Sequence, residues 1–229
     1  MKKSIQILIG LVVAIFCGLF IAKYSLMDQY SALDDKNPFQ GFEEIKDLTF
    51  NHIRIEGGNR DHLFVEPGAE NKVFISKRMN ENVTPVLSND TLIVEYPQNL
   101  TIDSEFEINR WGSREGATII IQCKALQSLV ANNASVGMNL ENSPIFTIDL
   151  NGGSNLAIDN IDASLNQLHV KAGGGSQLKL NENGGESHLS FMALQLKEQS
   201  LTELHHVRVD STAFDLTGDS KILAGSNFF

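Results

Sequence analysis

Apolar and polar residues alternate in short stretches along the C-terminal half of the chain. In residues 146–150 and 168–172 every second side chain is apolar, which places one apolar face along each stretch and predicts β-strands. This pattern recurs five times at intervals of 19, 22, 24 and 20 residues, aligned on Ser135, Ser154, Ser176, Ser200 and Ser220. The residues six positions before these serines are all apolar: Leu129, Ile148, Val170, Leu194 and Phe214. Repetition at this period predicts a β-solenoid, in which each copy forms one coil and buries its apolar face against the next.

The predicted corners of the coils have their own composition. Glycines precede Ser154, Ser176 and Ser220, and glycine tolerates the positive φ angles that tight bends require. All five prolines lie at or before Pro144, which suits a repeat region whose backbone N–H groups pair with neighbouring coils. Two corners lack this pattern, at Ser135 and Ser200, and we expect those bends to differ.

Stacked coils turn the polar positions into columns with a spacing of about 4.8 Å. One predicted outward column contains Val130, Asp149, Lys171, Gln195 and Asp215, and the next contains Ser128, Thr147, His169, Ala193 and Ala213. The pair Asp149 and Lys171 is expected to contribute little, because exposed ion pairs are worth about 0–1 kcal/mol. Both columns are typical of a solvated wall.

The amino terminus predicts a membrane anchor. Lys2 and Lys3 precede an uncharged, largely apolar run over residues 4–22, which is just long enough to span a bilayer as a helix, and Lys23 ends it. We expect residues 1–23 to form a transmembrane signal anchor, residues 24–41 a linker and residues 42–229 the folded domain. A cleaved secretory signal and lipidation at Cys17 are the alternatives, although the residues at both potential cleavage sites are unfavourable.

The positive-inside rule predicts a cytoplasmic N-terminus, with the domain in the periplasm or at the cell surface. Without Lys2, Lys3 and Lys23 the chain keeps 15 basic against 28 acidic residues, a formal charge of −13. Nucleic acid is therefore an unfavourable partner, because phosphate binding requires a basic surface. Cys123 is the only cysteine outside the anchor and lies in a strand-like apolar run, which is typical of a core position.

Short β segments also fill residues 53–94, and we expect them to form irregular first coils of the same solenoid. The pattern then lapses over residues 99–116, which predicts a long loop. Trp111, flanked by Arg110 and Arg114, is the candidate ligand-binding residue of this loop, because it could stack on a sugar or anchor a protein. The alternative is that Trp111 packs beneath its own loop.

The segments 53–55, 63–65, 73–75, 91–94 and 118–122, followed by Gly-x-Ser coils, resemble the auto-transporter adhesin, head GIN domain family. The resemblance covers roughly residues 42–229. It implies a right-handed parallel β-helix-like domain in the envelope of Bacteroidetes, often attached to a membrane by an amino-terminal segment. It implies no catalytic residues.

Candidate chemistry is sparse. The alternating acids Asp103, Glu105 and Glu107 form the best acidic cluster, but a solvated charged strand is the commoner explanation. Neighbouring His205 and His206 would point to opposite faces of a strand, so the sequence predicts no metal site there and no cofactor. No phosphate-binding loop or G-x-S-x-G motif occurs.

These observations favour an all-β, non-catalytic envelope protein, adhesin-like, whose wall binds a glycan or a protein. The alternative is a polysaccharide-active enzyme, either a lyase or a glycoside hydrolase built on a β-helix. The aromatic residues Phe228 and Phe229 are expected either to cover the last coil or to mark a surface for self-association.

Overall fold

The computed structural model describes residues 15–16, 18–24, 38–58, 62–77, 79, 83–96, 114, 116–181 and 185–225. The chain divides into two compact units, residues 1–41 and Phe42–Phe229. In the first unit residues 15–16 and 18–24 are helical. No helix within the described ranges is long and apolar enough to cross a membrane. Most of the expected anchor lies outside those ranges, so the transmembrane helix stays a prediction.

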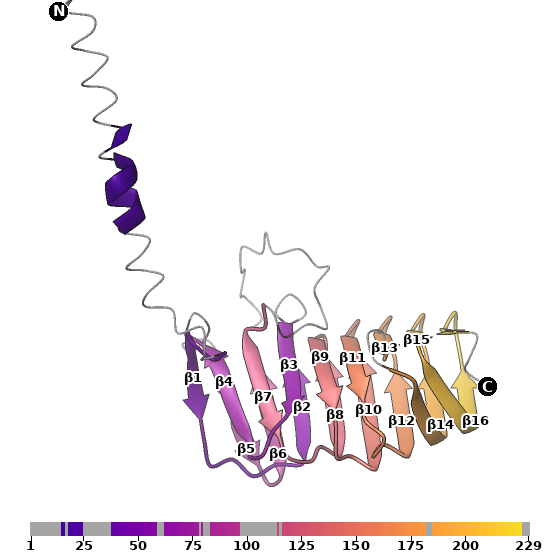
Figure 1. Ribbon diagram of the computed structural model, residues 1–229. Coiled ribbons are helices and arrows are strands. Elements are labelled where there is room, and N and C mark those ends of the chain that lie inside the picture. Colours follow the sequence, from indigo (N-terminus) through magenta and orange to yellow (C-terminus); the bar gives the residue numbers. More distant parts are fainter. Residues whose placement is uncertain are drawn as a thin grey trace, which may run out of the picture. The chain divides into compact units, whose positions relative to one another are not determined.

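The second unit is built from β-strands and forms a β-solenoid (Figure 1). The strands are β1 (Phe42–Ile45), β2 (His52–Glu56), β3 (His62–Pro67), β4 (Lys72–Ser76), β5 (Val86–Ser88), β6 (Thr91–Glu95), β7 (Ile119–Cys123), β8 (Ser128–Asn132), β9 (Ser135–Leu140), β10 (Ile145–Asn151), β11 (Asn155–Ile161), β12 (Gln167–Ala172), β13 (Gln177–Leu180), β14 (Ser187–Leu196), β15 (Leu201–Leu204), β16 (Val207–Leu216) and β17 (Lys221–Ala224).

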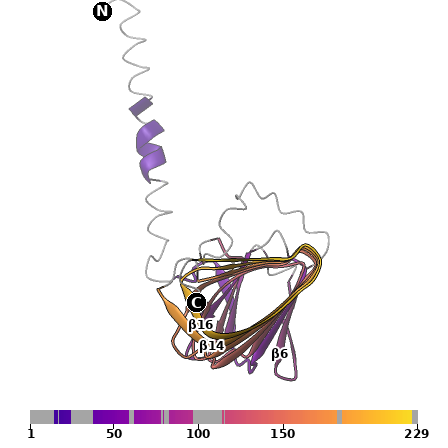
Figure 2. The ribbon, with the colours of Figure 1, turned by 90° about the vertical axis from the view of Figure 1, so that its right-hand side faces the viewer.

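From β8 onward the solenoid is regular. Each coil gives one strand to an eight-stranded sheet and the next strand to a nine-stranded sheet, and all neighbours in this region are parallel. Viewed from the C-terminal end, the coils lie over one another and enclose a single interior (Figure 2). The prediction of an all-β solenoid with parallel coils is confirmed.

The register confirms the predicted apolar column. Ile148 pairs with Leu129 on one side and with Val170 on the other, and Leu194 and Phe214 follow in the same column. The structure extends the column in the other direction through Ile53 to Leu92. All of these side chains except Phe214 are buried. The column therefore forms one continuous apolar ladder through the interior.

The serine alignment is right at four corners and wrong at the first. Ser135 pairs with Asn155 and belongs to strand β9, so the position of Ser154 in the next coil is occupied by Ala134 in this one. The first corner is one residue shorter than the second, and Asn133 takes a positive φ of 53° there. The sequence pattern hid this difference because Leu129 and Ile148, six residues before Ser135 and Ser154, are true register partners.

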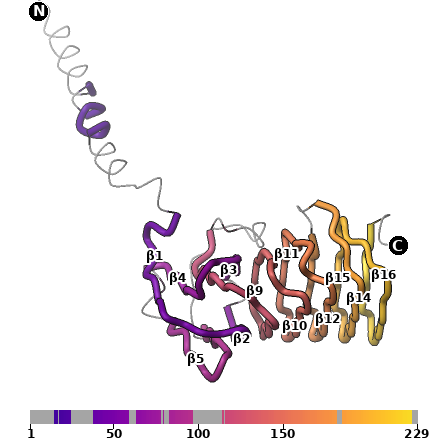
Figure 3. Tube along the Cα trace, turned by 60° about the horizontal axis from the view of Figure 1, so that its bottom comes forward, coloured from indigo at the N-terminus to yellow at the C-terminus, as the bar shows by residue number. Residues whose placement is uncertain are grey.

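The N-terminal end of the solenoid is threaded out of sequence order (Figure 3). Strands β2 and β3 pair with β8 and β9 on one side and with the later strands β6 and β7 on the other. Strands β1, β4 and β5 join this end by antiparallel pairing. Beneath them Phe50, Met79 and Val83 are buried. The expected irregular first coils are therefore a cap in which the earliest coil is not the outermost.

Candidate functional site

The loop residues proposed from the sequence are mostly outside the described ranges. This applies to Arg110 and Trp111, and to the acids Asp103, Glu105 and Glu107. Arg114 is described, and its Nε lies 2.8 Å from Oε2 of Glu66 on β3. Glu66 also accepts a hydrogen bond from Gln122 on β7. Arg114 is therefore tied to the wall of the nine-stranded sheet, and its role in ligand binding stays a prediction.

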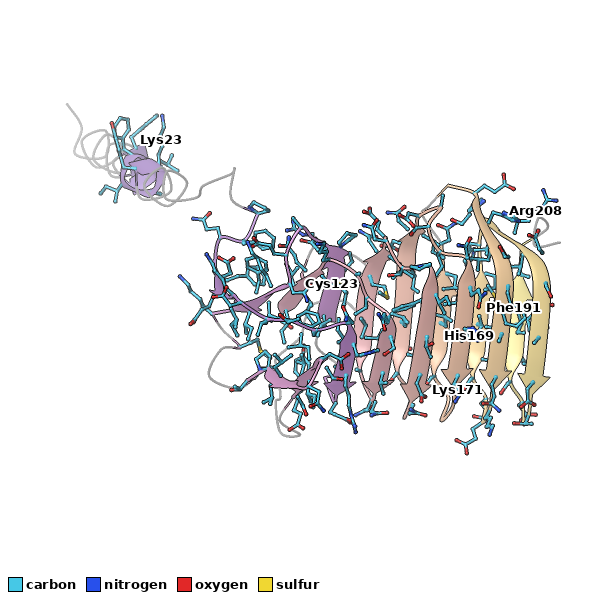
Figure 4. The ribbon with its side chains drawn as sticks, turned by 90° about the horizontal axis from the view of Figure 1, so that it is seen from below. Lys23, Cys123, His169, Lys171, Phe191 and Arg208 are labelled. Carbon is cyan, nitrogen blue, oxygen red and sulfur yellow. The ribbon has the colours of Figure 1, made fainter. Side chains whose placement is uncertain are left out.

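A second candidate surface lies on the outward face of the eight-stranded sheet, and we call it the outer wall. Its residues come from the four strands at the C-terminal end of this sheet, at positions that point away from the interior. They are Thr147 and Asp149 on β10, His169 and Lys171 on β12, Phe191, Ala193 and Gln195 on β14, and Ala213 and Asp215 on β16. Figure 4 shows His169, Lys171 and Phe191 on this part of the molecule.

A shallow hollow lies in the middle of the outer wall. His169, Ala193 and Ala213 occupy one column on successive coils. In this column the large imidazole of His169 is followed by two alanine methyl groups. The small alanine side chains leave the surface recessed beside His169. His169 lines one edge of the hollow, and the Phe191 ring lies beside it, with ring centroids 5.6 Å apart and planes inclined by 52°. The His169 imidazole, with Phe191 tilted against it, therefore gives this edge of the hollow an aromatic border.

Polar groups border the other edge of the hollow. Gln195 Nε2 donates a hydrogen bond of 2.9 Å to Asp215 Oδ2, which holds the amide and the carboxylate next to each other. Lys171 is exposed and precedes Gln195 in this column. It is the register neighbour of Asp149, yet the two form none of the ion pairs within the described ranges, and Asp149 instead accepts a hydrogen bond from Asn151. The Lys171 ammonium group can therefore bind a ligand without breaking an ion pair seen in the structure.

A serine, a histidine and an aspartate meet further along the same face. His52 Nδ1 lies 2.7 Å from Ser128 Oγ, and His52 Nε2 lies 3.3 Å from Asp90 Oδ2. These contacts have the connectivity of a hydrolytic triad. The surrounding amides of Asn51, His52 and Gln127 all donate to backbone carbonyls, so none of these three could stabilise an oxyanion. We interpret the cluster as a network that locks β2, β8 and the turn before β6 in register.

Other polar groups offer little chemistry. His188 Nε2 and Asp210 Oδ1 are 2.7 Å apart beside Glu186 and Arg208, in a second shallow hollow. Across the described ranges no group of three or more histidine, cysteine or acidic side chains is arranged to hold a metal ion. Cys123 is buried, and burial, with a smaller contribution from Glu66, raises the pKa of its thiol to about 12. This thiol is consequently protonated and unreactive near neutral pH.

No protein-family model matches the sequence, and no curated protein matches it. Solved structures of similar architecture exist, at low identity. A "putative adhesin" from Bacteroides fragilis is similar with a TM-score of 0.49 and 10% identity, over 80% of this chain and 95% of that one. A "putative adhesin" from Parabacteroides merdae has a TM-score of 0.43 and 12% identity, over 81% and 95% of the two chains.

A third similar structure is a "putative lipid binding protein" from Parabacteroides distasonis, with a TM-score of 0.37 and 12% identity over 81% of this chain and 96% of that one. The neighbours thus include proteins described as adhesins from Bacteroidetes. Similarity at this level assigns no ligand to the present chain, and membership of the head GIN domain family stays a prediction.

Proposed function

We propose that the protein is a non-catalytic, adhesin-like binding protein of the cell envelope, and that its outer wall binds an extended glycan. The observation that carries the proposal is the hollow above Ala193 and Ala213. His169, with the Phe191 ring beside it, borders the hollow on one edge, and an exposed lysine with a hydrogen-bonded amide and carboxylate borders it on the other. Rings that bury the apolar face of a sugar, beside planar polar groups that bind its hydroxyls, are the usual elements of carbohydrate recognition.

The shape of the wall favours an extended ligand over a compact one. Its side chains repeat at the coil spacing of about 4.8 Å, which is close to the rise of one sugar residue along an extended polysaccharide. A glycan that runs along the solenoid could therefore meet equivalent positions on β10, β12, β14 and β16 in turn. The shallow hollow, open to solvent, can hold one residue of such a chain without enclosing its ends.

A matched pair of lysines tests the proposal. Lys171 on β12 and Lys179 on β13 belong to the same coil but lie on opposite sheets. The full-length chain in detergent is applied to an array of neutral and acidic polysaccharides, and affinities are measured for the glycans that bind. We expect saturable binding without turnover. Lys171→Ala should weaken it about tenfold, as expected for a lost charge-assisted hydrogen bond, and Lys179→Ala should leave it unchanged.

Filling the hollow provides a second measurement. Ala193→Trp projects a large ring into the hollow from a half-buried outward position, so it should abolish binding while the circular dichroism spectrum stays that of the wild type. Equal losses for the two lysine variants would refute the outer wall as the site. Loss on Trp111→Ala alone would place the site in the loop at residues 99–116, and glycan cleavage would favour the polysaccharide-active enzyme.

The membrane location is part of the same proposal. The basic start and apolar run at residues 2–22 support an uncleaved anchor with the domain on the non-cytoplasmic side. Protease added outside intact spheroplasts should digest the domain, and the N-terminal peptide should stay in the membrane fraction. Protection of the whole chain from the protease would contradict this topology.

A further inference from the structure

A column of mostly charged side chains runs along the outward face of the eight-stranded sheet, and we call it the charge column. Its members occupy the same register position on successive strands: Arg54 on β2, Val130 on β8, Asp149 on β10, Lys171 on β12, Gln195 on β14 and Asp215 on β16. Neighbouring strands of a sheet lie about 4.8 Å apart. The last four members belong to the outer wall, so a ligand on that wall meets them one after another.

Three charged members of the column are already bound within the protein. Their partners are Glu56 for Arg54 at 2.6 Å, Asn151 for Asp149 at 2.9 Å and Gln195 for Asp215 at 2.9 Å. The side chain of Lys171, in contrast, forms no hydrogen bond or ion pair among the described residues. The column therefore presents one unpaired cation, with an acid one coil before it and another acid two coils after it.

We infer that the outer wall selects a glycan in which acidic sugars are sparse, so that one uronic acid lies against Lys171 and the sugars beside it are neutral. This inference rests on the proposed glycan-binding function, in which successive sugars meet successive coils. A uronic acid carries the carboxylate that an unpaired ammonium group binds best, because hydrogen bonds between opposite charges are about twice as strong as those between neutral groups.

The positions on either side of Lys171 disfavour a second acid. An acidic sugar one coil earlier would face Asp149, and an acidic sugar two coils later would face Asp215, in both cases as a like charge. On the coil between, Gln195 is neutral and its amide already donates to Asp215, so a carboxylate gains no cation there. Of the four coils of the outer wall, only the coil of β12 favours an acidic sugar.

The charge of the whole domain supports the same selectivity. Without the three lysines of the expected anchor, the chain has 15 basic against 28 acidic residues. A polymer with an acid on every sugar is therefore repelled as it approaches, whereas a polymer with few acids keeps the local attraction at Lys171. Salt screens repulsion over distances beyond about 10 Å at about 0.1 M. Added salt should consequently help a densely acidic glycan more than a sparsely acidic one.

Polysaccharides that differ only in their density of acid provide the test. Soluble linear glucan, mannan and galactan are each prepared in three forms: neutral, oxidised at the primary hydroxyl to a uronic acid on a small fraction of residues, and fully oxidised. Affinities are measured for the full-length chain in detergent. For at least one glycan, the sparsely oxidised form should bind about tenfold more tightly than the neutral form, and also more tightly than the fully oxidised form. Raising the salt from about 0.1 M to about 0.5 M should narrow the gap between the two oxidised forms.

Substitutions that remove single charges assign the selectivity to residues. Lys171→Gln should abolish the preference for the sparsely oxidised form over the neutral one. Lys221→Gln is the matched control, because Lys221 is exposed on β17 of the other sheet, and it should preserve that preference. Asp149→Asn removes a negative charge at nearly constant size and should raise the affinity for the fully oxidised form about threefold.

The outcomes distinguish this inference from the function on which it rests. Equal affinity for the neutral and sparsely oxidised forms would overturn the selectivity and leave glycan binding intact, and so would tightest binding of the fully oxidised form. A preference that survives Lys171→Gln would refute the charge column as its source. Binding that is unaffected by Ala193→Trp, or failure of every form to bind, would overturn the inference and the proposed function together.

Discussion

Glu198 and Gln199 adopt backbone conformations that other corners give to glycine. Their φ angles are 56° and 65°, and Gly174 and Gly175 take 63° and 75° at the equivalent positions of the preceding coil. The sequence indicated that this bend would differ because it lacks glycine, yet the structure gives it the same conformation. A left-handed backbone conformation costs about 1–2 kcal/mol per non-glycine residue. Stacking of successive coils with the same corner geometry outweighs this cost. Glu198 recovers part of that cost, because its Oε2 accepts a hydrogen bond from Gly174.

Cys123 leads to a prediction about pH. Burial raises the pKa of its thiol from 9.0 to about 12, so above pH 9.0 the unfolded chain releases this proton and the folded chain holds it. The contribution of Cys123 is complete below pH 9.0, and the free energy of unfolding then falls as the pH rises toward about 12. Cys123→Ala should lack this component. Urea unfolding of both proteins between pH 8 and about 11 measures the difference. A constant difference across this range would contradict the buried, protonated thiol.

At the scale of the element, a stacked corner is held by its serine. The hydroxyl of Ser176 donates to the carbonyl of Gly173 over 2.6 Å and accepts from the backbone N–H of Ser154 over 3.2 Å. Ser154, Ser200 and Ser220 donate to the carbonyl three residues earlier in the same way. A buried hydroxyl that serves two coils at once supplies the backbone partners that a sharp bend would otherwise lose.

Removing this hydroxyl should therefore be costly in the middle of the stack. We expect Ser176→Ala to lower the free energy of unfolding by about 1–3 kcal/mol, because one buried N–H and one carbonyl lose a partner. Ser220→Ala on the last corner, where the hydrogen bond is exposed, is the matched control and should cost less than about 0.5 kcal/mol. Chemical denaturation of both variants measures the two values. Equal costs would show that contact between coils does not depend on the serine.

The strands were largely predictable, and the bend at Ser135 differs as its missing glycine predicted, but the register of its serine was not predictable. Alternation in 146–150 and 168–172 predicted the apolar column because strand periodicity is local and survives in a single sequence. The shorter first corner changes no side-chain pattern, so only the register of Asn155 with Ser135 shows it. The hollow was also missed, since Ala193 and Ala213 are typical of a plain solvated column until the larger His169 is seen beside them.

At the scale of the molecule, one core extends through the whole solenoid. The buried residues of both sheets form a single cluster from Phe50 near the cap to Val209 on β16. The sequence could not predict the order of strands at the cap, because β2 and β6 are similar apolar segments and nothing local says which lies outermost. The continuous core predicts that the domain unfolds as one unit. The greater exposure of β16 predicts that substitutions there destabilise the domain less than substitutions in the middle of the stack.

Two leucines of one interior column test whether a position on β16 contributes less stability than its neighbour on β14. Leu196 is 0% exposed and Leu216 is 45% exposed, and the two are register partners. Leu196→Ala should lower the free energy of unfolding by about 2–5 kcal/mol, and Leu216→Ala by less than about 1 kcal/mol. Thermal unfolding followed by calorimetry and by circular dichroism should give one coincident transition for each variant. Separate transitions for the cap and the coils would contradict a single core.

The strand order at the cap also determines when the first coil can fold during synthesis. Strands β2 and β3 are synthesised early, but their neighbours come later: β6 and β7 on one side end at Cys123, and β8 and β9 on the other side end at Leu140. Until Leu140 has emerged, this coil lacks its neighbours on one side, and the apolar residues on that side stay exposed to wrong partners. A nascent chain of this protein should therefore depend on chaperones for its first 140 residues and add its later coils one after another, each on a finished template.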